Sequence, residues 1–230
     1  MVDRDRFDEF LRERAAQAGA LRRTGVFEKI ERGADGVNVI HYRRRDSQRA
    51  GEGTPARVRA LATIGADGAN SAVARQSVPG AERVKHVFAY HEILARPEQP
   101  PEGYDGSRCD VWYQGKLSPD FYGWVFPHGD TLSVGTGSAD KGFSLRNAVG
   151  ELREATGLQH AKTLRREGAP LPMKPLKRWD NGRDVILAGD AAGVVAPSSG
   201  EGIYYAMLGG TLAADATEEF CLTGDPRALK

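Results

Sequence analysis

The chain has 230 residues, with 32 basic and 31 acidic side chains and a formal net charge of +1. Hydrophobic residues make up 40% of it, which is enough for one large core or two modest ones and excludes a disordered chain. The balanced charge argues against a nucleic-acid-binding protein, and no run approaches the roughly 18 consecutive apolar residues of a membrane span. Cys109 and Cys221 indicate neither a metal-type pair nor a disulfide framework, and the N-terminus lacks the apolar run of a signal peptide. We therefore expect a reduced, cytosolic protein.

The first third of the chain predicts a helix followed by a hairpin and a further strand. Residues 3–18 carry apolar side chains at helical spacing and end at Gly19. Alternating residues on both sides of a turn at 34–36 predict the hairpin. The polar stretch 43–57 predicts an exposed loop, and residues 58–64 predict a strand that runs into a Gly-Ala-Asp-Gly segment and a helix.

The rest of the chain changes character twice. Between residues 84 and 137 the pattern is that of aromatic-rich strands, and residues 145–156 predict a helix with Ser144 as its N-cap. The short apolar run 184–188 is typical of a strand buried on both faces, and a glycine-rich loop leads from it into a long helix over 202–222. The order indicates an α/β domain that is interrupted by a mainly β domain.

The loop after residues 184–188 has the composition of a ligand-binding turn. Gly189 and Asp190 directly follow the strand, at the end where open sheets bind ligands. An aspartate there accepts hydrogen bonds from ribose or ribitol hydroxyls, and small residues such as Gly193 let the backbone approach a ligand. The run from Pro197 to Gly202 opens the long helix, whose free amides suit an anion. A plain strand-turn-helix junction is the alternative.

Three motifs together resemble those of the geranylgeranyl reductase family. Gly189-Asp190 and Asp67-Gly68 are similar to the two downstream fingerprints of flavoprotein hydroxylases and reductases. The run Pro197-Ser198-Ser199-Gly200-Glu201-Gly202 is similar to the segment that opens the last helix in geranylgeranyl reductases. Tyr122-Gly123-Trp124-Val125-Phe126-Pro127 fits that family's Tyr-x-Trp-x-Phe-Pro motif in the substrate domain.

The resemblance implies a two-domain flavoprotein fold, in which an FAD-binding sheet domain is interrupted by an antiparallel β substrate domain. The corresponding expectation is an FAD-binding part at 1–83, a substrate-binding sheet at 84–178 and a second FAD-binding part at 179–230. It implies FAD as cofactor, NADPH or reduced ferredoxin as electron donor, and saturation of isoprenoid double bonds in (bacterio)chlorophyll biosynthesis. The substrate would be geranylgeranyl diphosphate or geranylgeranyl-bacteriochlorophyll, and the protein would associate peripherally with the photosynthetic membrane.

The resemblance also implies roles for single residues. Those expected at the cofactor are Asp67, Gly68, Gly189, Asp190, Gly193, Pro197, Gly200, Glu201 and Gly202. Asp190 would bind the FAD ribose, and Asp67 would orient amides or water near the pyrophosphate. Tyr122, Trp124, Phe126 and Pro127 would bind substrate, because alternate residues of a strand share one face. No catalytic residue is assigned and no metal site is expected; of the five histidines, only His128 lies beside the aromatic motif.

One departure from the family pattern concerns the N-terminal Gly-x-Gly-x-x-Gly unit that cradles the FAD diphosphate. That unit is absent from this sequence, so we expect an internal fragment of a longer enzyme that by itself purifies without flavin and is inactive. The alternatives are an archaeal-type membrane-lipid reductase, a flavin aromatic monooxygenase and an inactive lipid-binding fragment. A hydroxylase usually has a His and an Asn where this chain has Gly193 and Tyr204.

Overall fold

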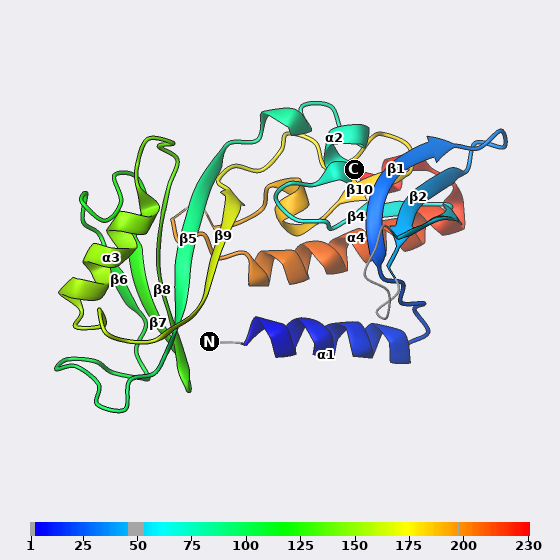
Figure 1. The fold of residues 1–230 in the computed structure, drawn as a ribbon. Coiled ribbons are helices and arrows are strands. Elements are labelled where there is room, and N and C mark those ends of the chain that lie inside the picture. Colours follow the sequence, from blue (N-terminus) through cyan, green and yellow to red (C-terminus); the bar gives the residue numbers. More distant parts are fainter. Residues whose placement is uncertain (1–2, 46–52, 197) are drawn as a thin grey trace. The chain divides into compact units, whose positions relative to one another are not determined.

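The computed structural model describes residues 3–45, 53–196 and 198–230, and these form two units (Figure 1). The large-sheet unit consists of helix α1 (Arg4–Gln17) and the segment His86–Leu171. The paired-strand unit consists of the segments Ala20–Lys85 and Pro172–Lys230. The paired-strand unit is therefore built from two separate stretches of the chain, between which the large sheet is inserted.

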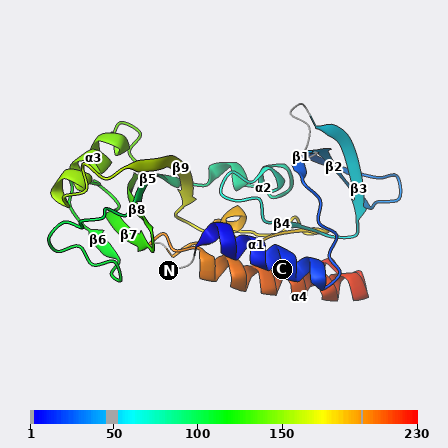
Figure 2. The same cartoon turned by 60° about the horizontal axis from the view of Figure 1, so that its bottom comes forward.

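The large-sheet unit is organised around a five-stranded sheet with the order β6-β7-β8-β5-β9. The strands are β5 (His86–Ala95), β6 (Asp110–Trp112), β7 (Gly123–His128), β8 (Thr131–Ser138) and β9 (Thr163–Pro172). Helix α3 (Leu145–Ala155) lies over this sheet, beside β5 and β8 (Figure 2). Ser144 caps its first turn by accepting a hydrogen bond from the Asn147 amide, which confirms the predicted cap.

Strand alternation divides the large sheet into two different faces. Val125 lies opposite Val134 in the register of β7 and β8, and both are buried beneath Val149 and Leu152 of α3. The neighbouring residue Trp124 lies opposite Gly135 and therefore belongs to the other face. One face of the sheet thus forms an apolar core with α3, while the other carries the aromatic motif.

The core of this unit also encloses a carboxylate, that of Glu92 on β5, whose side chain is 8% exposed. Arg153 of α3 forms an ion pair with it, and Tyr90, Thr163 and Arg166 donate hydrogen bonds at 2.9, 3.1 and 3.0 Å. Burial by itself raises the pKa of Glu92, but these hydrogen bonds outweigh burial and hold the pKa below its ordinary value of 4.5. The ionised carboxylate therefore connects β5, β9 and α3.

The paired-strand unit contains two small sheets. Strands β1 (Gly25–Arg32), β2 (Asn38–Arg44) and β3 (Thr54–Ala60) form an antiparallel sheet, and β4 (Thr63–Gly65) pairs in parallel with β10 (Val185–Leu187). Its helices are α2 (Ala72–Ser77) and α4 (Ile203–Thr223), with short 3₁₀ turns at Ala81–Arg83, Gly189–Ala192 and Pro226–Leu229.

A buried apolar cluster and one ion pair hold the two small sheets together. Val73 of α2 packs with Val185 and Leu187 of β10, and Phe27 of β1 packs against this cluster. Arg32 at the end of β1 forms an ion pair with the buried Asp184, which directly precedes β10. The hairpin is thereby fixed to the strand that leads into the glycine-rich loop.

Two predicted elements differ from the structure. The predicted strand 58–64 is two strands, because β3 pairs with β2 whereas β4 pairs with β10, and the chain bends at Leu61 and Ala62 between the two sheets. The predicted loop 43–57 is shorter than expected, because β2 extends to Arg44 and β3 begins at Thr54. The helix at the N-terminus, the hairpin, the helix after Ser144 and the long last helix are confirmed. Across the described ranges, no helix is long and apolar enough to cross a membrane.

We predict that the buried ion pair is the most sensitive polar contact of the large-sheet unit. Arg153→Met should lower the free energy of unfolding by about 3–5 kcal/mol, because it leaves a buried carboxylate without its main partner. Arg146→Met, at an exposed position of the same helix, should change it by no more than about 0.5 kcal/mol. Urea unfolding at neutral pH measures both. Because the pKa of Glu92 is lowered, the ionised carboxylate contributes to stability above pH 4.5, and this contribution is lost as the pH falls through the folded-state pKa. Glu92→Gln should abolish this pH dependence.

Candidate functional site

The two glycine-aspartate motifs meet at one edge of the paired-strand unit. Val185, Ile186 and Leu187 of β10 lie beside Thr63, Ile64 and Gly65 of β4 in parallel register. The register continues beyond the strands, since the Ala188 amide donates to the Gly65 carbonyl at 2.9 Å. Asp67 and Asp190 therefore follow the carboxyl ends of two adjacent parallel strands, which is the position of ligand sites in open α/β sheets.

Asp67 is used to organise the main chain at this edge. One of its oxygens accepts from the Ala72 amide at 2.8 Å and the Val73 amide at 3.2 Å, and the other accepts from the Ser71 hydroxyl. Ser71 in turn accepts from the Ala74 amide at 2.8 Å. The Asp67 carboxylate thus satisfies free amides at the start of α2. Gly68, in the loop between β4 and α2, has a φ of 81°.

The turn after β10 is closed by its own backbone. The Gly193 amide donates to the Asp190 carbonyl at 3.0 Å, and the Val194 amide donates to the Gly189 carbonyl at 3.2 Å. Gly193 has a φ of 77°, and a Cβ there would lie 2.6 Å from the Lys174 carbonyl oxygen. Both the conformation and the close approach require glycine at this position. The Gly193 amide is occupied within the turn.

The Asp190 carboxylate points toward the residues that open α4. A Cβ at Gly202 would lie 3.3 Å from one Asp190 carboxylate oxygen and 3.2 Å from a methyl group of Val195. Helix α4 also packs tightly on the turn, because a Cβ at Gly189 would lie 3.2 Å from that of Ala206. The glycines on both sides therefore allow the aspartate, the turn and the helix N-terminus to come together.

The start of α4 already carries a negative charge of its own. The Glu201 carboxylate accepts a hydrogen bond from the Tyr204 amide at 2.9 Å, and the Ala196 amide donates to the Glu201 carbonyl at 2.8 Å. Glu201 therefore acts as a helix cap, and its carboxylate uses one amide of the first turn. Gly200 has a φ of 67°. Pro197, which we also expected at the cofactor, lies outside the described residues.

The aromatic motif forms a continuous row on one face of the large sheet. The Tyr122 and Trp124 ring centroids are 5.9 Å apart, and those of Trp124 and Phe126 are 6.1 Å apart. This confirms that the three rings share a face. Pro127 lies opposite Leu132 on the other face, at a point of β7 beyond the three residues that pair with β6. A proline is tolerated there because β6 needs no amide from it.

Sequence reasoning missed a polar group that lies against this row. His91 of β5 is within 2.9 Å of the Ser133 hydroxyl through Nδ1, and the same hydroxyl accepts from the Trp124 indole at 3.0 Å. The other ring nitrogen of His91 lies 3.2 Å from Glu167. Burial lowers the pKa of His91, and the nearby Glu167 carboxylate opposes this only in part. The pairing of β5 with β8 brings His91 to Ser133, so no local sequence pattern could have predicted this contact. His128, the histidine that the sequence singled out, is exposed at the end of β7.

Two chemistries are available among these residues. The edge of the paired-strand unit combines a carboxylate, closely packed glycines and a helix N-terminus, which suits a ligand with both hydroxyl groups and anionic character. The aromatic row suits a long apolar ligand. Among the described residues, no group of His, Cys, Asp or Glu side chains is arranged to hold a metal ion.

Comparison with known proteins identifies the family. Residues 1–214 match the model of the FAD binding domain family, and the chain belongs to this family. It is 53% identical over 230 residues to a geranylgeranyl diphosphate reductase of Rhodobacter capsulatus, which covers 100% of this chain and 56% of that protein. It is 29% identical over 231 residues to a digeranylgeranylglycerophospholipid reductase of Methanocaldococcus jannaschii, covering 95% of this chain and 55% of that protein.

Solved structures of flavoproteins are similar to this chain. A geranylgeranyl bacteriochlorophyll reductase-like protein from Thermoplasma acidophilum has a TM-score of 0.76 and 25% identity, covering 98% of this chain and 57% of that one. The anhydrotetracycline hydroxylase OxyS from Streptomyces rimosus has a TM-score of 0.63 at 20% identity, covering 100% of this chain and 45% of that one, and shows the fold alone. These similarities confirm the predicted flavoprotein fold and the resemblance to geranylgeranyl reductases. The chain spans about half the length of the curated relatives it matches.

We predict that the burial of His91 makes the large-sheet unit sensitive to mild acid. Because the folded-state pKa lies below the ordinary value of 6.5, the unfolded chain takes up this proton more readily, and stability is lost as the pH falls below 6.5. His91→Gln should reduce this loss in urea unfolding between about pH 7.5 and about pH 5.5. The exposed His160→Gln should keep the wild-type pH dependence, and identical slopes for all three proteins would contradict the prediction.

We also predict that the backbone of the turn after β10 controls cofactor retention. Gly193→Ala should cost about 1–3 kcal/mol of stability and release FAD from the full-length protein, because φ is positive and the Lys174 carbonyl is too close. Gly150→Ala is the matched control, since nothing lies within 4 Å of a Cβ there and α3 should gain roughly 0.5–1 kcal/mol. Thermal unfolding and the flavin absorbance of the purified proteins measure both effects. Full flavin content in Gly193→Ala would refute the prediction.

Proposed function

We propose that the full-length protein containing this chain is an FAD-dependent reductase that saturates double bonds of a geranylgeranyl chain in (bacterio)chlorophyll biosynthesis. The observation that carries this proposal is the 53% identity to the Rhodobacter reductase, which extends over both units of the chain. The archaeal lipid reductase, at 29% identity, is a weaker match, so the pigment pathway is favoured over membrane-lipid synthesis.

The edge of the paired-strand unit would hold the flavin cofactor. The Asp190 carboxylate would accept hydrogen bonds from ribose hydroxyls, and Gly202 lets the start of α4 approach it, since a Cβ there would lie 3.3 Å from one of its oxygens. Asp67 would act indirectly, by orienting the amides at the start of α2. Because the Gly193 amide closes its own turn, phosphate oxygens would be bound by other amides of this edge. Bound FAD, once reduced by NADPH or ferredoxin, would supply the hydride.

The start of α4 would contribute to the environment of the flavin ring. The partial positive charge of a helix N-terminus stabilises a nearby anion by roughly 0.3–1 kcal/mol, and by up to about 2 kcal/mol in partly buried positions. Glu201 limits this effect, because its carboxylate already accepts from the Tyr204 amide. Gly200 and Gly202 would therefore serve mainly to bring the backbone close to the ring.

The aromatic row would bind the isoprenoid chain. Tyr122, Trp124 and Phe126 form one row of rings, in which Tyr122 and Trp124 are only 8% and 9% exposed. The Trp124 indole donates to the Ser133 hydroxyl, which also contacts His91. Burial raises the pKa of Tyr122, so its phenol stays neutral at physiological pH beside an apolar chain. Pro127 would shape the end of the strand from the opposite face rather than contact substrate. Either the free diphosphate or the pigment ester, the latter at the surface of the photosynthetic membrane, suits such a wall.

The full-length, flavin-loaded protein should add hydrogen to geranylgeranyl substrates. Anaerobic incubation with chemically reduced flavin and either geranylgeranyl diphosphate or geranylgeranyl-bacteriochlorophyll, followed by mass spectrometry, tests this directly. The expected products are heavier by two, four or six hydrogens, one pair for each saturated double bond. Unchanged masses for both substrates would refute the proposed function, and oxygen incorporation into an aromatic substrate in air would favour a monooxygenase instead.

Two tryptophans of the same sheet separate substrate binding from core packing. Trp124→Ala should reduce turnover of geranylgeranyl substrates at least tenfold while the protein keeps its flavin, because it opens the aromatic row. Trp112→Ala is the matched control: Trp112 pairs in β6 with Gly123 and packs against the core on the α3 side. Both substitutions should lower stability by about 3–5 kcal/mol, because Trp124 is buried and Trp112 is half-buried, but Trp112→Ala should leave KM for the isoprenoid unchanged. Wild-type turnover in a folded Trp124→Ala variant would exclude Trp124 from the substrate wall.

A further inference from the structure

A chain of polar contacts runs from the aromatic row of the large sheet to its edge strand β9. The Trp124 indole donates to the Ser133 hydroxyl at 3.0 Å, and Nδ1 of His91 lies 2.9 Å from the same hydroxyl oxygen. Nε2 of His91 lies 3.2 Å from a carboxylate oxygen of Glu167. The four side chains come from β7, β8, β5 and β9, which are neighbours in this order in the sheet. The contacts therefore cross four successive strands.

The direction of the hydrogen bonds follows from which groups can donate. A carboxylate can only accept, so Nε2 of the neutral His91 ring carries the proton and Nδ1 is left as an acceptor. The Ser133 hydroxyl therefore donates to Nδ1, and its oxygen accepts from the Trp124 indole, which can only donate. Burial lowers the pKa of His91, so the ring is neutral at physiological pH. Every hydrogen bond of the chain points from Trp124 toward Glu167.

Packing by itself does not fix which way the Trp124 ring is turned. Gly135 is the register partner of both Trp124 and His91, and a Cβ there would lie 2.5 Å from Trp124 Cε2 and 2.6 Å from the His91 Cβ. The indole therefore lies across the glycine, and its ring centroid is 6.2 Å from that of His91. The outer torsion of a tryptophan side chain is broad and roughly two-fold, so a directed contact is needed to select one orientation. The hydrogen bond to Ser133 is such a contact.

Ser133 holds the indole only when its own hydroxyl is oriented. A hydroxyl rotates to suit its partners, and its lone pairs turn with it. His91 supplies the acceptor that sets this rotation, and Glu167 fixes which nitrogen of His91 is protonated. Glu167 is itself paired with Arg165 at 3.0 Å. The charged and titratable groups that act on His91 lie on β9, which carries Glu167 and Arg165, and on β7, which carries His128.

We propose that His91 is a positioning residue for the aromatic row, in which it sets the orientation of the Trp124 indole through the Ser133 hydroxyl. The inference rests on the proposed function, because the aromatic row is the proposed binding surface for the isoprenoid chain. A protonated His91 ring turns Nδ1 into a donor, which competes with the indole for the lone pairs of Ser133. Isoprenoid affinity therefore falls in mild acid.

The orientation of the indole can be followed without any substrate. The protein is the full-length, flavin-loaded enzyme labelled with ¹⁵N at its tryptophan indoles, and Trp124→Phe identifies the Trp124 Nε1–H signal by its loss. This NMR signal should move as the pH falls from about 7.5 to about 5.5, because His91 takes up a proton over this range. The movement should be absent in His91→Phe and in His91→Asn, and His128→Gln should keep it.

Steady-state turnover of a geranylgeranyl substrate tests the consequence for binding. At about pH 7.5, His91→Phe should raise KM roughly two- to tenfold, which is the range for one lost hydrogen bond, and change kcat less. His91→Asn keeps an acceptor near the position of Nδ1, so it should restore most of the wild-type KM and lose the rise of KM in acid. In the Trp124→Phe background, which has no indole N–H, His91→Phe should leave KM unchanged.

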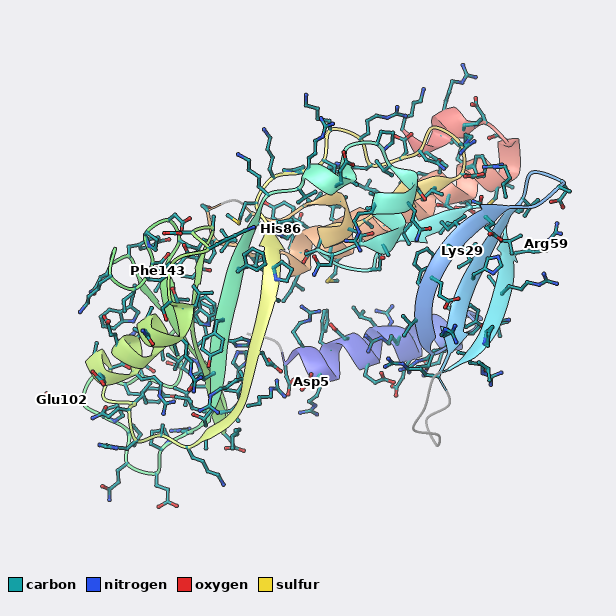
Figure 3. All side chains as sticks on the ribbon, turned by 45° about the horizontal axis from the view of Figure 1, so that its top comes forward. Asp5, Lys29, Arg59, His86, Glu102 and Phe143 are labelled. Carbon is teal, nitrogen blue, oxygen red and sulfur yellow. The ribbon has the colours of Figure 1, made fainter. Side chains whose placement is uncertain are left out.

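The matched control makes the same change at another histidine of the same strand. His86 is the first residue of β5 and is labelled in Figure 3. His86→Phe should keep the wild-type KM and the wild-type movement of the Trp124 signal. Thermal unfolding and flavin absorbance show whether each variant is folded and loaded. An equal rise of KM in both Trp124 backgrounds, or a Trp124 signal that still moves with pH in His91→Phe, would overturn the proposal.

The two readouts keep this proposal separate from the proposed function. A Trp124 signal that depends on His91, in a protein that reduces no geranylgeranyl substrate, would support the positioning of the indole and refute the reductase assignment alone. Reduction of the substrate with a wild-type KM in His91→Phe would overturn the role of His91 and leave the reductase assignment intact.

Discussion

The parallel pairing of β4 with β10 is the constraint on which the candidate cofactor site depends. These strands are only three residues long and are separated by more than a hundred residues of chain, yet their register brings Asp67 and Asp190 to one edge. The two strands are stabilised by the apolar cluster of Val73, Val185 and Leu187 and by the Arg32–Asp184 ion pair. Without the pairing, each motif would be an ordinary capped turn. With it, a carboxylate, a glycine turn and a helix N-terminus become neighbours.

The large sheet carries an apolar core on one face and a row of aromatic residues on the other. Strand alternation gives Val125 and Val134 to the α3 side and leaves Trp124 and Phe126 on the opposite side. The Glu92 carboxylate, bound by groups from β5, β9 and α3, fixes the core side. His91, which directly precedes Glu92 in the same strand, contacts the Ser133 hydroxyl that holds the Trp124 indole on the aromatic side. Neighbouring residues of one strand therefore fix the two faces of the sheet separately.

Two helix-capping carboxylates lie at the candidate cofactor site. Asp67 and Glu201 have carboxylates that could repel a phosphate, but each is already engaged by amides of the helix that it precedes. Such engagement keeps the loops in place before any ligand arrives, so that binding need not order them.

Local sequence determined much of this protein. The spacing of apolar residues gave the helices, Ser144 gave a cap, and the Tyr122, Trp124 and Phe126 alternation gave a shared face, because each depends only on near neighbours in the chain. The motifs also sufficed to indicate the family and its flavin. Tertiary structure alone decided the break between β3 and β4, the contact of His91 with Trp124 through Ser133, and the ion pair of Arg32 with Asp184. Each of these depends on which strand pairs with which and in what register, and a register is fixed by the packing of distant segments rather than by any local pattern.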